Sequence, residues 1–372
     1  MQPGASSRSF LPHLARVKAA TLFGRRITPP FVTLYVTTRC DERCIHCFYW
    51  DELNPKPNLD FTLSEFERTL GSMGEIFNLF IGGGEPFLRA DLAEILLAAY
   101  GRNEVANAYV PTNGQHAERV VRTLERVLAR AERLRLHVNL SIDHVDEREH
   151  DRIRGRQGAY RRLLQTADAI RDLRRAYPNL ILHTLTTVMR DNQSEILRIH
   201  EEIKRRFEPD GTSYNYCRGN PLDARQAEVD LQAYRGLASR LRQDRLAGRI
   251  REGALGGLNH GLDEQVRCSI EKTVREKRAQ FSCVAGRLAC VIYSNGDVAE
   301  CETKNSLVGN LRDVDCDFRS LWFGEKAESV AAEAANGCHC THECGHYAST
   351  IYSARLLGSV VGRAMGAGLR RG

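Results

Sequence analysis

Two hydrophobic periods alternate along residues 31–217 of the chain. Short apolar runs rich in β-branched and aromatic residues are typical of buried strands, and they occur at Phe31–Thr37, Asn78–Ile81, Asn107–Pro111, Leu136–Ile142, Leu180–Val188 and Thr212–Cys217. The intervening segments have the apolar spacing of helices, at Thr62–Met73, Ala90–Tyr100, Ala117–Ala131, Tyr160–Arg175 and Gln193–Phe207. In the first helix Thr62 is the expected N-cap, and Glu65 follows three residues later in a capping-box pattern.

Strands that alternate with helices imply a parallel sheet with right-handed crossovers. Six such units suit a partial (β/α)6 barrel, so the expected fold class is α/β. In parallel β/α barrels the reactive groups collect at the carboxyl ends of the strands, where the motifs described below also fall. We expect the barrel to occupy residues 28–221.

The rest of the chain divides by its composition. Residues 222–280 have a helical, strongly charged pattern and predict a bridging segment. From residue 281 the cysteines become dense and the regular pattern is lost, so residues 281–347 are expected to form a small cysteine-rich domain. Residues 1–27 form a basic amphipathic segment, and residues 348–372 form a basic tail. We expect both ends to dock on the barrel as helices, with contact to an anionic membrane surface as the alternative.

The 372 residues are 42% hydrophobic and 27% charged, which is ordinary for a globular protein. No apolar run is long enough to span a bilayer, and the N-terminus lacks a signal-peptide pattern, so a cytoplasmic protein is expected. Twelve cysteines in such a chain indicate metal binding rather than disulfides. The net charge of +6 arises at the ends, because residues 1–40 and 345–372 carry ten basic residues and no acid, leaving −4 for the body. We therefore expect no nucleic-acid partner.

The first predicted strand is followed by Cys40, Cys44 and Cys47, in the spacing C-x3-C-x2-C. Three thiolates can hold three irons of a [4Fe–4S] cluster and leave the fourth iron without a protein ligand. Such an open position allows a cluster to bind a substrate or co-substrate. The alternatives are a zinc knuckle and a plain electron-transfer cluster, which both need a fourth ligand nearby. His46 is poorly placed for that role because it is the neighbour of Cys47.

Further motifs follow the later strands. They are GGGEP at Gly82–Pro86, TNG at Thr112–Gly114, SID at Ser141–Asp143 and HDRIRG at His150–Gly155. With the cysteine loop, these motifs resemble the radical S-adenosylmethionine (SAM) superfamily in both content and order. The resemblance implies a partial barrel and a [4Fe–4S] cluster whose open iron binds SAM. One-electron transfer from that cluster splits SAM into methionine and a 5′-deoxyadenosyl radical.

The resemblance also implies which residues contact SAM. Glu85 is expected to meet the SAM ammonium, and Arg154 is a candidate for its carboxylate. The expected SAM-binding residues are Gly82, Gly83, Gly84, Glu85, Pro86, Thr112, Asn113, Ser141, Asp143 and Arg154. The glycines allow backbone to approach the ligand closely.

A second cysteine group lies near the C-terminus. The stretch from Cys283 to Cys301 has the spacing C-x12-G-x4-C and contains a hairpin turn at 294–297. It resembles the start of the SPASM and twitch domains that follow many radical SAM barrels, as do the sequences GNL at 309–311 and LW at 321–322. Because the cysteines are too few for two clusters, one auxiliary [4Fe–4S] cluster is expected. Its expected ligands are Cys283, Cys301 and Cys344, with either Cys338 or Cys340 as the fourth.

A structural zinc site is the alternative for this second group. Cys290 and Cys316 are expected to be simply buried. Cys217 ends the sixth predicted strand and could donate a hydrogen atom to a substrate radical, although a packed core thiol is the more ordinary interpretation. Asp143 and Glu302 are conceivable bases. Arg218 could hold an anionic group, with a surface salt bridge as the alternative.

These features predict a radical SAM enzyme that abstracts hydrogen from an organic substrate, with oxidation or epimerisation as the outcome. Only about 30 residues precede the barrel, which favours a small molecule (a natural product, a sugar or aminocyclitol, or a lipid headgroup). Maturation of a ribosomal peptide is the alternative. A zinc- or cluster-binding module in electron transfer or assembly is the non-enzymatic alternative. The expected reductant is a flavodoxin or ferredoxin.

Overall fold

The computed structural model describes residues 7–247, 256–336 and 339–368. Its strands are β1 Phe31–Thr37, β2 Asn78–Gly83, β3 Asn107–Thr112, β4 Arg135–Ser141, β5 Leu180–Val188, β6 Gly211–Tyr216, β7 Ala289–Ile292, β8 Asp297–Ala299 and β9 Leu307–Asn310. The first six strands match the predicted ones to within two residues at each end. The α/β expectation is thereby confirmed.

The helices comprise an N-terminal helix, those of the barrel, and those of the bridge and C-terminal part. The first two sets are α1 Ser7–Leu22, α2 Leu63–Ser72, α3 Leu92–Asn103, α4 Ala117–Leu128, α5 Glu147–Arg154, α6 Ala159–Ala176 and α7 Ile196–Phe207. The third set is α8 Leu231–Leu246, α9 Gly256–Glu276, α10 Phe318–Trp322, α11 Glu325–Ala335, α12 Glu343–Tyr352 and α13 Ala354–Gly368. Short 3-10 helices lie at Pro86–Leu88, Gln193–Glu195, Ala224–Ala227 and Leu311–Val314.

One nine-stranded sheet organises the molecule, in the order β6-β5-β4-β3-β2-β1-β7-β8-β9. Strands β1 to β6 are parallel to their neighbours, and β7 adds to β1 in parallel, pairing Phe31 with Ala289 and Leu34 with Ile292. β8 and β9 continue the sheet in antiparallel hairpins. The C-terminal cysteine region is therefore joined to the barrel strands through the backbone hydrogen bonds of a single sheet.

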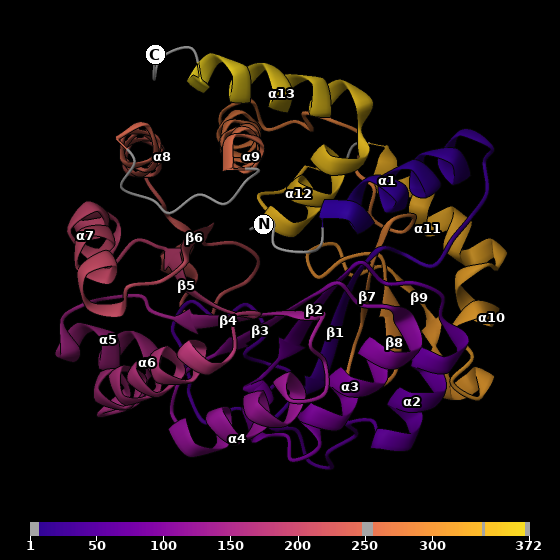
Figure 1. The fold of residues 1–372 in the computed structure, drawn as a ribbon, viewed down its shortest axis with the longest axis horizontal. Coiled ribbons are helices and arrows are strands. Elements are labelled where there is room, and N and C mark those ends of the chain that lie inside the picture. The colour runs from indigo at the N-terminus through magenta and orange to yellow at the C-terminus, as the bar shows by residue number, and fades with distance from the viewer. Residues whose placement is uncertain (1–6, 248–255, 337–338, 369–372) are drawn as a thin grey trace.

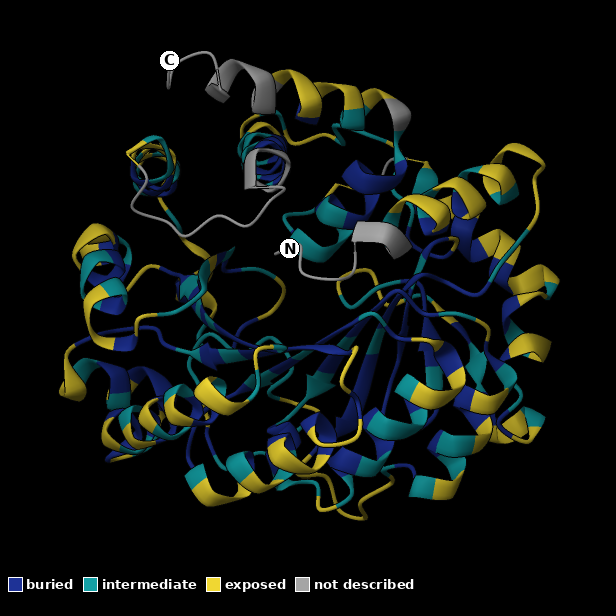
Figure 2. Cartoon of the chain, viewed as in Figure 1, coloured by how far each residue is buried: buried dark blue, intermediate teal, exposed yellow. Residues whose placement is uncertain are grey.

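The core lies between this sheet and its outer helices. Figure 2 shows the central strands largely in dark blue and the solvent faces of the outer helices in yellow. α4 is typical, because Val120, Leu124 and Val127 recur at helical spacing and are fully buried. α2 begins with the predicted capping box, in which the Thr62 side chain accepts from the Glu65 amide and Glu65 accepts from the Thr62 amide.

The other side of the sheet is covered by the bridge and the C-terminal helices, where α8, α9 and α12 lie across the top of the view in Figure 1. One helix was missed from the sequence, and one expectation was wrong. α5 was missed because Ile153 is its only aliphatic residue, although Asp146 caps it by accepting from the Glu149 amide. The C-terminal region is also regularly helical; α10 is only five residues long and depends on its Asp317 cap, which is too short for a periodic signal.

The N-terminal helix α1 docks on the barrel, as the first interpretation of its pattern predicted. Val17 is fully buried, and the His13 ring stacks on Phe77 with centroids 4.3 Å apart. The same imidazole bonds the Glu75 carboxylate and the Tyr352 hydroxyl, each at 2.7 Å. Within the described ranges, no helix combines the length and apolar character needed to cross a membrane.

Candidate functional site

The cysteine loop leaves the carboxyl end of β1 and is held by the end of α5. The amides of Arg43 and Ile45 donate to the carbonyls of Arg154 (3.1 Å) and Ile153 (3.0 Å). Gly155 caps α5 in a left-handed conformation (φ 63°), and a Cβ there would lie 2.6 Å from the Arg43 carbonyl oxygen. The HDRIRG motif thus forms the support under the cysteine loop, and its glycine is required by the close backbone approach.

The glycine-rich turn after β2 holds the other side of this loop. The amides of Gly84 and Glu85 donate to the carbonyls of Thr37 and Arg39, each at 2.8 Å. A Cβ on Gly84 would lie 2.2 Å from the Arg39 carbonyl oxygen, and one on Gly83 would lie 2.2 Å from that of Thr37. Gly82 faces the large cavity described below, and Pro86 starts the 3-10 helix that ends the turn.

Glu85 is buried and joins two of the motifs. Its Oε1 accepts from the Phe87 amide (3.1 Å) and the Thr112 hydroxyl (3.0 Å), and its Oε2 accepts from the Asn113 amide (2.7 Å). Burial raises the pKa of this carboxyl to about 7, against the opposing effect of these donors. The expectation that Glu85 meets an ammonium stays a prediction, because the carboxylate already ties the glycine-rich turn to the TNG turn.

Asp41, inside the cysteine loop, was not singled out from the sequence. Its carboxylate accepts from the Asn113 side-chain amide (2.8 Å) and the Arg156 guanidinium (3.0 Å), and lies 2.9 Å from the His116 imidazole. These partners come from the turn after β3 and the end of α5. The only sequence signal was the position of this acid between the first two cysteines of the loop.

Arg154, the predicted carboxylate partner, lies in a buried cluster beside Cys44. Its Nη2 is 2.8 Å from Asp143 Oδ2, and its Nη1 is 3.6 Å from both Glu42 Oε2 and Cys44 Sγ. Burial raises the pKa of Cys44, and Arg154 opposes that effect. Burial also acts to raise the pKa of Asp143, but Arg154 and His46 hold it below its ordinary value.

Asp143 is therefore anchored in this cluster. Its Oδ1 accepts from the Thr187 amide at 2.9 Å, while Ser141 ends β4 two residues earlier. The predicted site residues that contact the cysteine loop directly are Gly84, Glu85, Asn113, Asp143 and Arg154. Thr112 reaches that loop through Glu85.

The second cysteine group surrounds one small cavity of about 40 Å³, lined by Cys283, Cys301, Cys340 and Cys344. Cys301 follows β8, whose hairpin turn is as predicted, since the Tyr293 amide donates to the Asp297 carbonyl. Cys338 lies outside the described residues. Cys290 on β7 is buried and also borders this cavity, and Cys316 is buried in the main core. Five thiols therefore border this cavity. A set of four among them suits a [4Fe–4S] cluster, and suits zinc as well.

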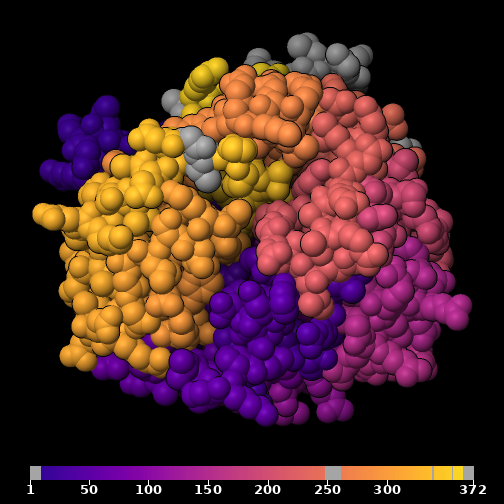
Figure 3. Space-filling model, turned by 180° about the vertical axis from the view of Figure 1, so that it is seen from behind, coloured from indigo at the N-terminus to yellow at the C-terminus, as the bar shows by residue number. Residues whose placement is uncertain are grey.

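A second, larger cavity of about 800 Å³ connects the two cysteine groups. Its lining includes Cys47, Gly82 and Gly83 on the barrel side and Glu302 and Cys344 on the C-terminal side. Figure 3, seen from behind, shows the indigo N-terminal part, the orange C-terminal part and the salmon bridge meeting on one face.

Polar side chains line this cavity between the two groups. Glu302 accepts from the Tyr35 hydroxyl at 2.9 Å and lies 2.8 Å from the His342 imidazole and 3.9 Å from the Arg218 guanidinium. Burial acts to raise the pKa of Glu302, but His342 and Arg218 lower it to about 2. Glu302 is therefore ionised at neutral pH. Tyr35 and His342 were missed because their role depends on contacts between residues that are far apart in the sequence.

Two other predicted residues, Cys217 and Arg218, directly follow β6. Cys217 is buried with Ile153 and Met189 and is not among the residues that line the large cavity. This burial favours the packed core thiol, and the role of hydrogen-atom donor stays a prediction. Arg218 pairs with the Glu343 carboxylate at 2.5 Å, so its guanidinium is already partnered. Both environments depend on packing, because the sequence pattern alone does not specify which way the end of the sixth strand turns.

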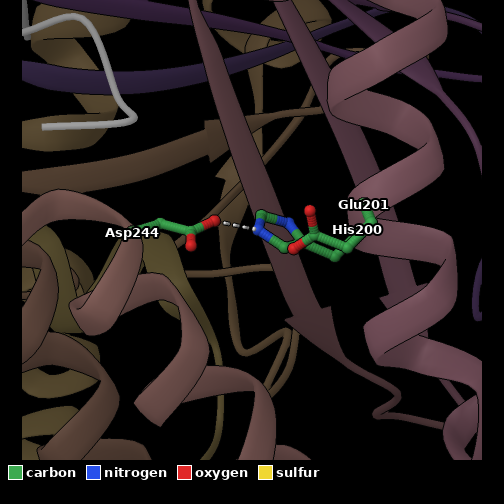
Figure 4. A group of neighbouring side chains, drawn as sticks. All are labelled: His200, Glu201 and Asp244. Atoms are coloured by element: carbon green, nitrogen blue, oxygen red, sulfur yellow. Dashed lines mark hydrogen bonds and ion pairs between the residues drawn. The ribbon is translucent and has the colours of Figure 1, made fainter. Parts of the chain in front are cut away.

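His200, Glu201 and Asp244 form a group whose ligand atoms are close enough for a metal ion, and Figure 4 shows the His200 ring directed at the Asp244 carboxylate. Lys204 and Arg240 already neutralise it, because both cations contact Asp244 and Arg240 also contacts Glu201. The group therefore forms an ion-pair network that joins α7 to α8.

The parallel sheet and the open three-cysteine loop define a class of enzymes that bind an iron–sulfur cluster with one free iron. The family model of the radical SAM superfamily matches residues 34–205, so this part of the chain is a radical SAM domain. Members of this superfamily use a [4Fe–4S] cluster and SAM.

Two relatives and one solved structure illustrate the similarity. The AdoMet-dependent heme synthase of Methanosarcina barkeri is 26% identical over 319 residues, which cover 81% of this chain and 83% of that protein. The PqqA peptide cyclase of Bradyrhizobium diazoefficiens is 30% identical over 147 residues, which cover 39% of this chain and only 37% of that protein. The fold matches anSMEcpe with bound AdoMet at a TM-score of 0.61 and 16% identity, covering 92% of this chain and 100% of that one.

Proposed function

We propose that this radical SAM enzyme oxidises a peptide, and that Cys40, Cys44 and Cys47 hold its SAM-binding [4Fe–4S] cluster. When bound, the cluster and SAM supply a 5′-deoxyadenosyl radical by one-electron cleavage of SAM. The fit of the loop supports this assignment. Its backbone is held on one side by the glycine-rich turn after β2 and on the other by the end of α5. The loop itself supplies three cysteines, which leaves one iron open.

We assign an auxiliary [4Fe–4S] cluster to Cys283, Cys301, Cys340 and Cys344, because these four line one cavity. The barrel is proposed to span residues 28–221, the bridge residues 222–280 and the auxiliary domain residues 281–347. A second cluster near the substrate suits an oxidation, in which the substrate radical gives up one more electron after losing a hydrogen atom.

The observation that carries this proposal is the cavity of about 800 Å³ that borders both cysteine groups. Cavities of ~300–1,000 Å³ are typical of ligand sites, and this one is large enough for several residues of a peptide. The buried Arg154 side chain contacts Asp143, Glu42 and Cys44, and these contacts fix the position of the cysteine loop. Glu302 and Tyr35 offer an ionised acceptor and a hydroxyl that can orient amide groups of the substrate.

A peptide substrate is favoured over the small molecule expected from the sequence. The anSMEcpe fold has also been solved with a bound Cp18Cys peptide, and the PqqA peptide cyclase is 30% identical to this chain over its aligned part. The cavity itself supports a substrate of low net charge, because its lining has five basic side chains (Arg174, Lys204, Arg218, Arg245, Arg267) and five acidic ones (Glu208, Asp210, Asp263, Glu302, Glu343).

The heme synthase relative favours a second candidate, a porphyrin substrate, because its match extends over most of both chains. A ring with several carboxylates would meet no net positive charge in this cavity. We therefore rank it second. One assay, described next, tests both the peptide and the porphyrin as substrates.

The test is anaerobic reconstitution followed by dithionite and SAM, with Fe-coproporphyrin III or peptides encoded by neighbouring genes as substrates. The expected results are 5′-deoxyadenosine formation and about eight irons per chain. Deuterium transfer from a labelled peptide into 5′-deoxyadenosine would identify the substrate class, whereas transfer from the porphyrin alone would overturn the peptide assignment. No 5′-deoxyadenosine at all would contradict the enzyme assignment.

Matched cysteine variants test the auxiliary cluster. Cys283→Ala should reduce the iron content to about four per chain, while Cys316→Ala, in the main core, should retain about eight. Equal iron in both variants would contradict the assigned ligands.

A further inference from the structure

β6 ends the nine-stranded sheet and is paired on one side only. Its register with β5 is unbroken from Gly211 to Tyr216, and the Cys217 amide donates to the Val188 carbonyl at 3.0 Å. Because alternate residues of a strand direct their backbone groups to opposite sides, Ser213 and Asn215 face β5. Thr212, Tyr214 and Tyr216 therefore direct their N–H and C=O groups to the free edge.

Only some of the backbone groups on the free edge have hydrogen-bond partners. The Tyr216 amide donates to Glu343 Oε1 at 2.8 Å. In the part of the chain that the structure describes, the amides of Thr212 and Tyr214 have no hydrogen-bond partner. Tyr214 is buried, and burying backbone polar groups without partners is costly. The edge thus offers a short row of unused donors and acceptors.

This edge lies inside the large cavity, whose lining includes residues 211–215. The facing wall comes from α8 and α9 and is mainly apolar, formed by Tyr234, Leu237, Leu241, Leu262, Val266 and Ile270. An added strand would lie about 4.8 Å from β6. Its backbone would pair with β6, while its side chains would contact the apolar wall.

We propose that an extended segment of the substrate binds as an additional strand on the free edge of β6. This inference rests on the peptide-oxidising function proposed above, and it adds the mode of recognition. Main-chain pairing at an exposed sheet edge gives affinity with little dependence on sequence, and pockets beside it select side chains.

The position of Glu343 sets where this pairing ends. Its carboxylate, from α12, stands at Tyr216 where the carbonyl of a neighbouring strand would stand, and it also pairs with Arg218. The chain after β6 then contacts the cysteine loop, because the Leu222 amide donates to the Cys47 carbonyl at 3.1 Å. Substrate residues beyond the paired segment would therefore continue toward Cys47, which borders the same cavity.

The test uses reconstituted full-length protein with SAM and a library of random decapeptides deuterated at Cα, beside the same library N-methylated at every residue, which leaves no N–H on either edge of the peptide. Amide-resolved hydrogen exchange should slow at least tenfold at Thr212 and Tyr214 with the first library and not with the second. The Ser213 amide, already facing β5, should be unchanged. Unchanged exchange at Thr212 and Tyr214, or equal protection by both libraries, would overturn edge pairing.

Deuterium transfer into 5′-deoxyadenosine, measured after dithionite is added as the one-electron reductant, separates this proposal from the function on which it rests. Equal transfer from both libraries would support peptide oxidation and refute edge pairing. Protection at Thr212 and Tyr214 without any transfer would support edge pairing and refute peptide oxidation. Thr212→Pro removes one outward N–H and should weaken library binding about tenfold relative to Thr212→Val, which keeps it; equal affinities would count against the proposal.

Discussion

Gly84→Ala should loosen the cysteine loop, because the two loops that carry the radical SAM motifs touch through the backbone at this residue. The new methyl carbon would lie 2.2 Å from the Arg39 carbonyl oxygen and 3.1 Å from Cys40 Cβ. A relaxed C···O contact is about 3.3 Å, so one backbone must move by roughly 1 Å. Neither neighbour is the flexible end of a side chain.

The cost follows from the bonds that this movement breaks. The amides of Gly84 and Glu85 would lose their 2.8 Å bonds to Thr37 and Arg39, at about 0.5–1.5 kcal/mol each. With residual strain, the free energy of unfolding should fall by about 2–4 kcal/mol. The displaced Cys40 should also reduce the iron retained after reconstitution.

Gly101→Ala is the matched control. Gly101 lies in α3, is exposed, and has nothing within 4 Å of an added Cβ. Alanine should stabilise that helix by about 0.5–1 kcal/mol. Urea unfolding of the reconstituted proteins and iron per chain measure both effects. If Gly84→Ala unfolds at the wild-type urea concentration with full iron, the argument from close backbone approach is wrong.

Two further predictions concern stability away from the site. Arg312 and the Thr62 cap lower the pKa of Glu65 to about 2, so the stabilisation by its carboxylate is present above the unfolded pKa of about 4.3 and is lost as the pH falls toward 2. Glu65→Gln should therefore lower the free energy of unfolding by about 1 kcal/mol at pH 7. Its urea midpoint should converge with that of the wild type near pH 2. A difference in midpoint that stays constant with pH would contradict stabilisation by the ionised Glu65 carboxylate. Trp322 is fully buried, donates to the Ile27 carbonyl at 3.0 Å and lies under Arg26, so Trp322→Ala should cost about 3–5 kcal/mol. Phe323→Ala, at a position 39% exposed, should change the unfolding free energy by less than about 0.5 kcal/mol, and similar losses in the two variants would count against a core role for Trp322.

The barrel could be predicted from the sequence because each strand is a short run of buried β-branched or aromatic residues between helices of clear period. Phe31–Thr37 and Leu180–Val188 were located to the residue. α5 could not be found in this way, since a helix that supports a loop rather than a core needs few apolar residues. Its Asp146 cap and Gly155 end were present as signals, but neither is specific alone.

Only part of the site could be predicted from the sequence. The cysteines and glycines could be predicted because their spacing depends on local backbone geometry, and residues close in sequence determine that geometry. Asp41, Tyr35 and His342 act through partners on other elements, so no spacing identifies them. The large cavity depends on how α8 and α9 pack over the sheet, and that packing has no local sequence signature.

The shared strand β1 explains why two distant cysteine groups border one cavity. The cysteine loop leaves its carboxyl end, while β7 pairs along its other side from Phe31 to Leu34. The β7–β8 hairpin then returns the chain to Cys301, and Glu302 bonds the Tyr35 hydroxyl on β1 itself. Because side chains on one face of a strand are fixed relative to each other, the separation of the two groups is set by the sheet rather than by a mobile domain contact. Any substrate held between them, including one paired to β6, is therefore presented to both groups by a single rigid element.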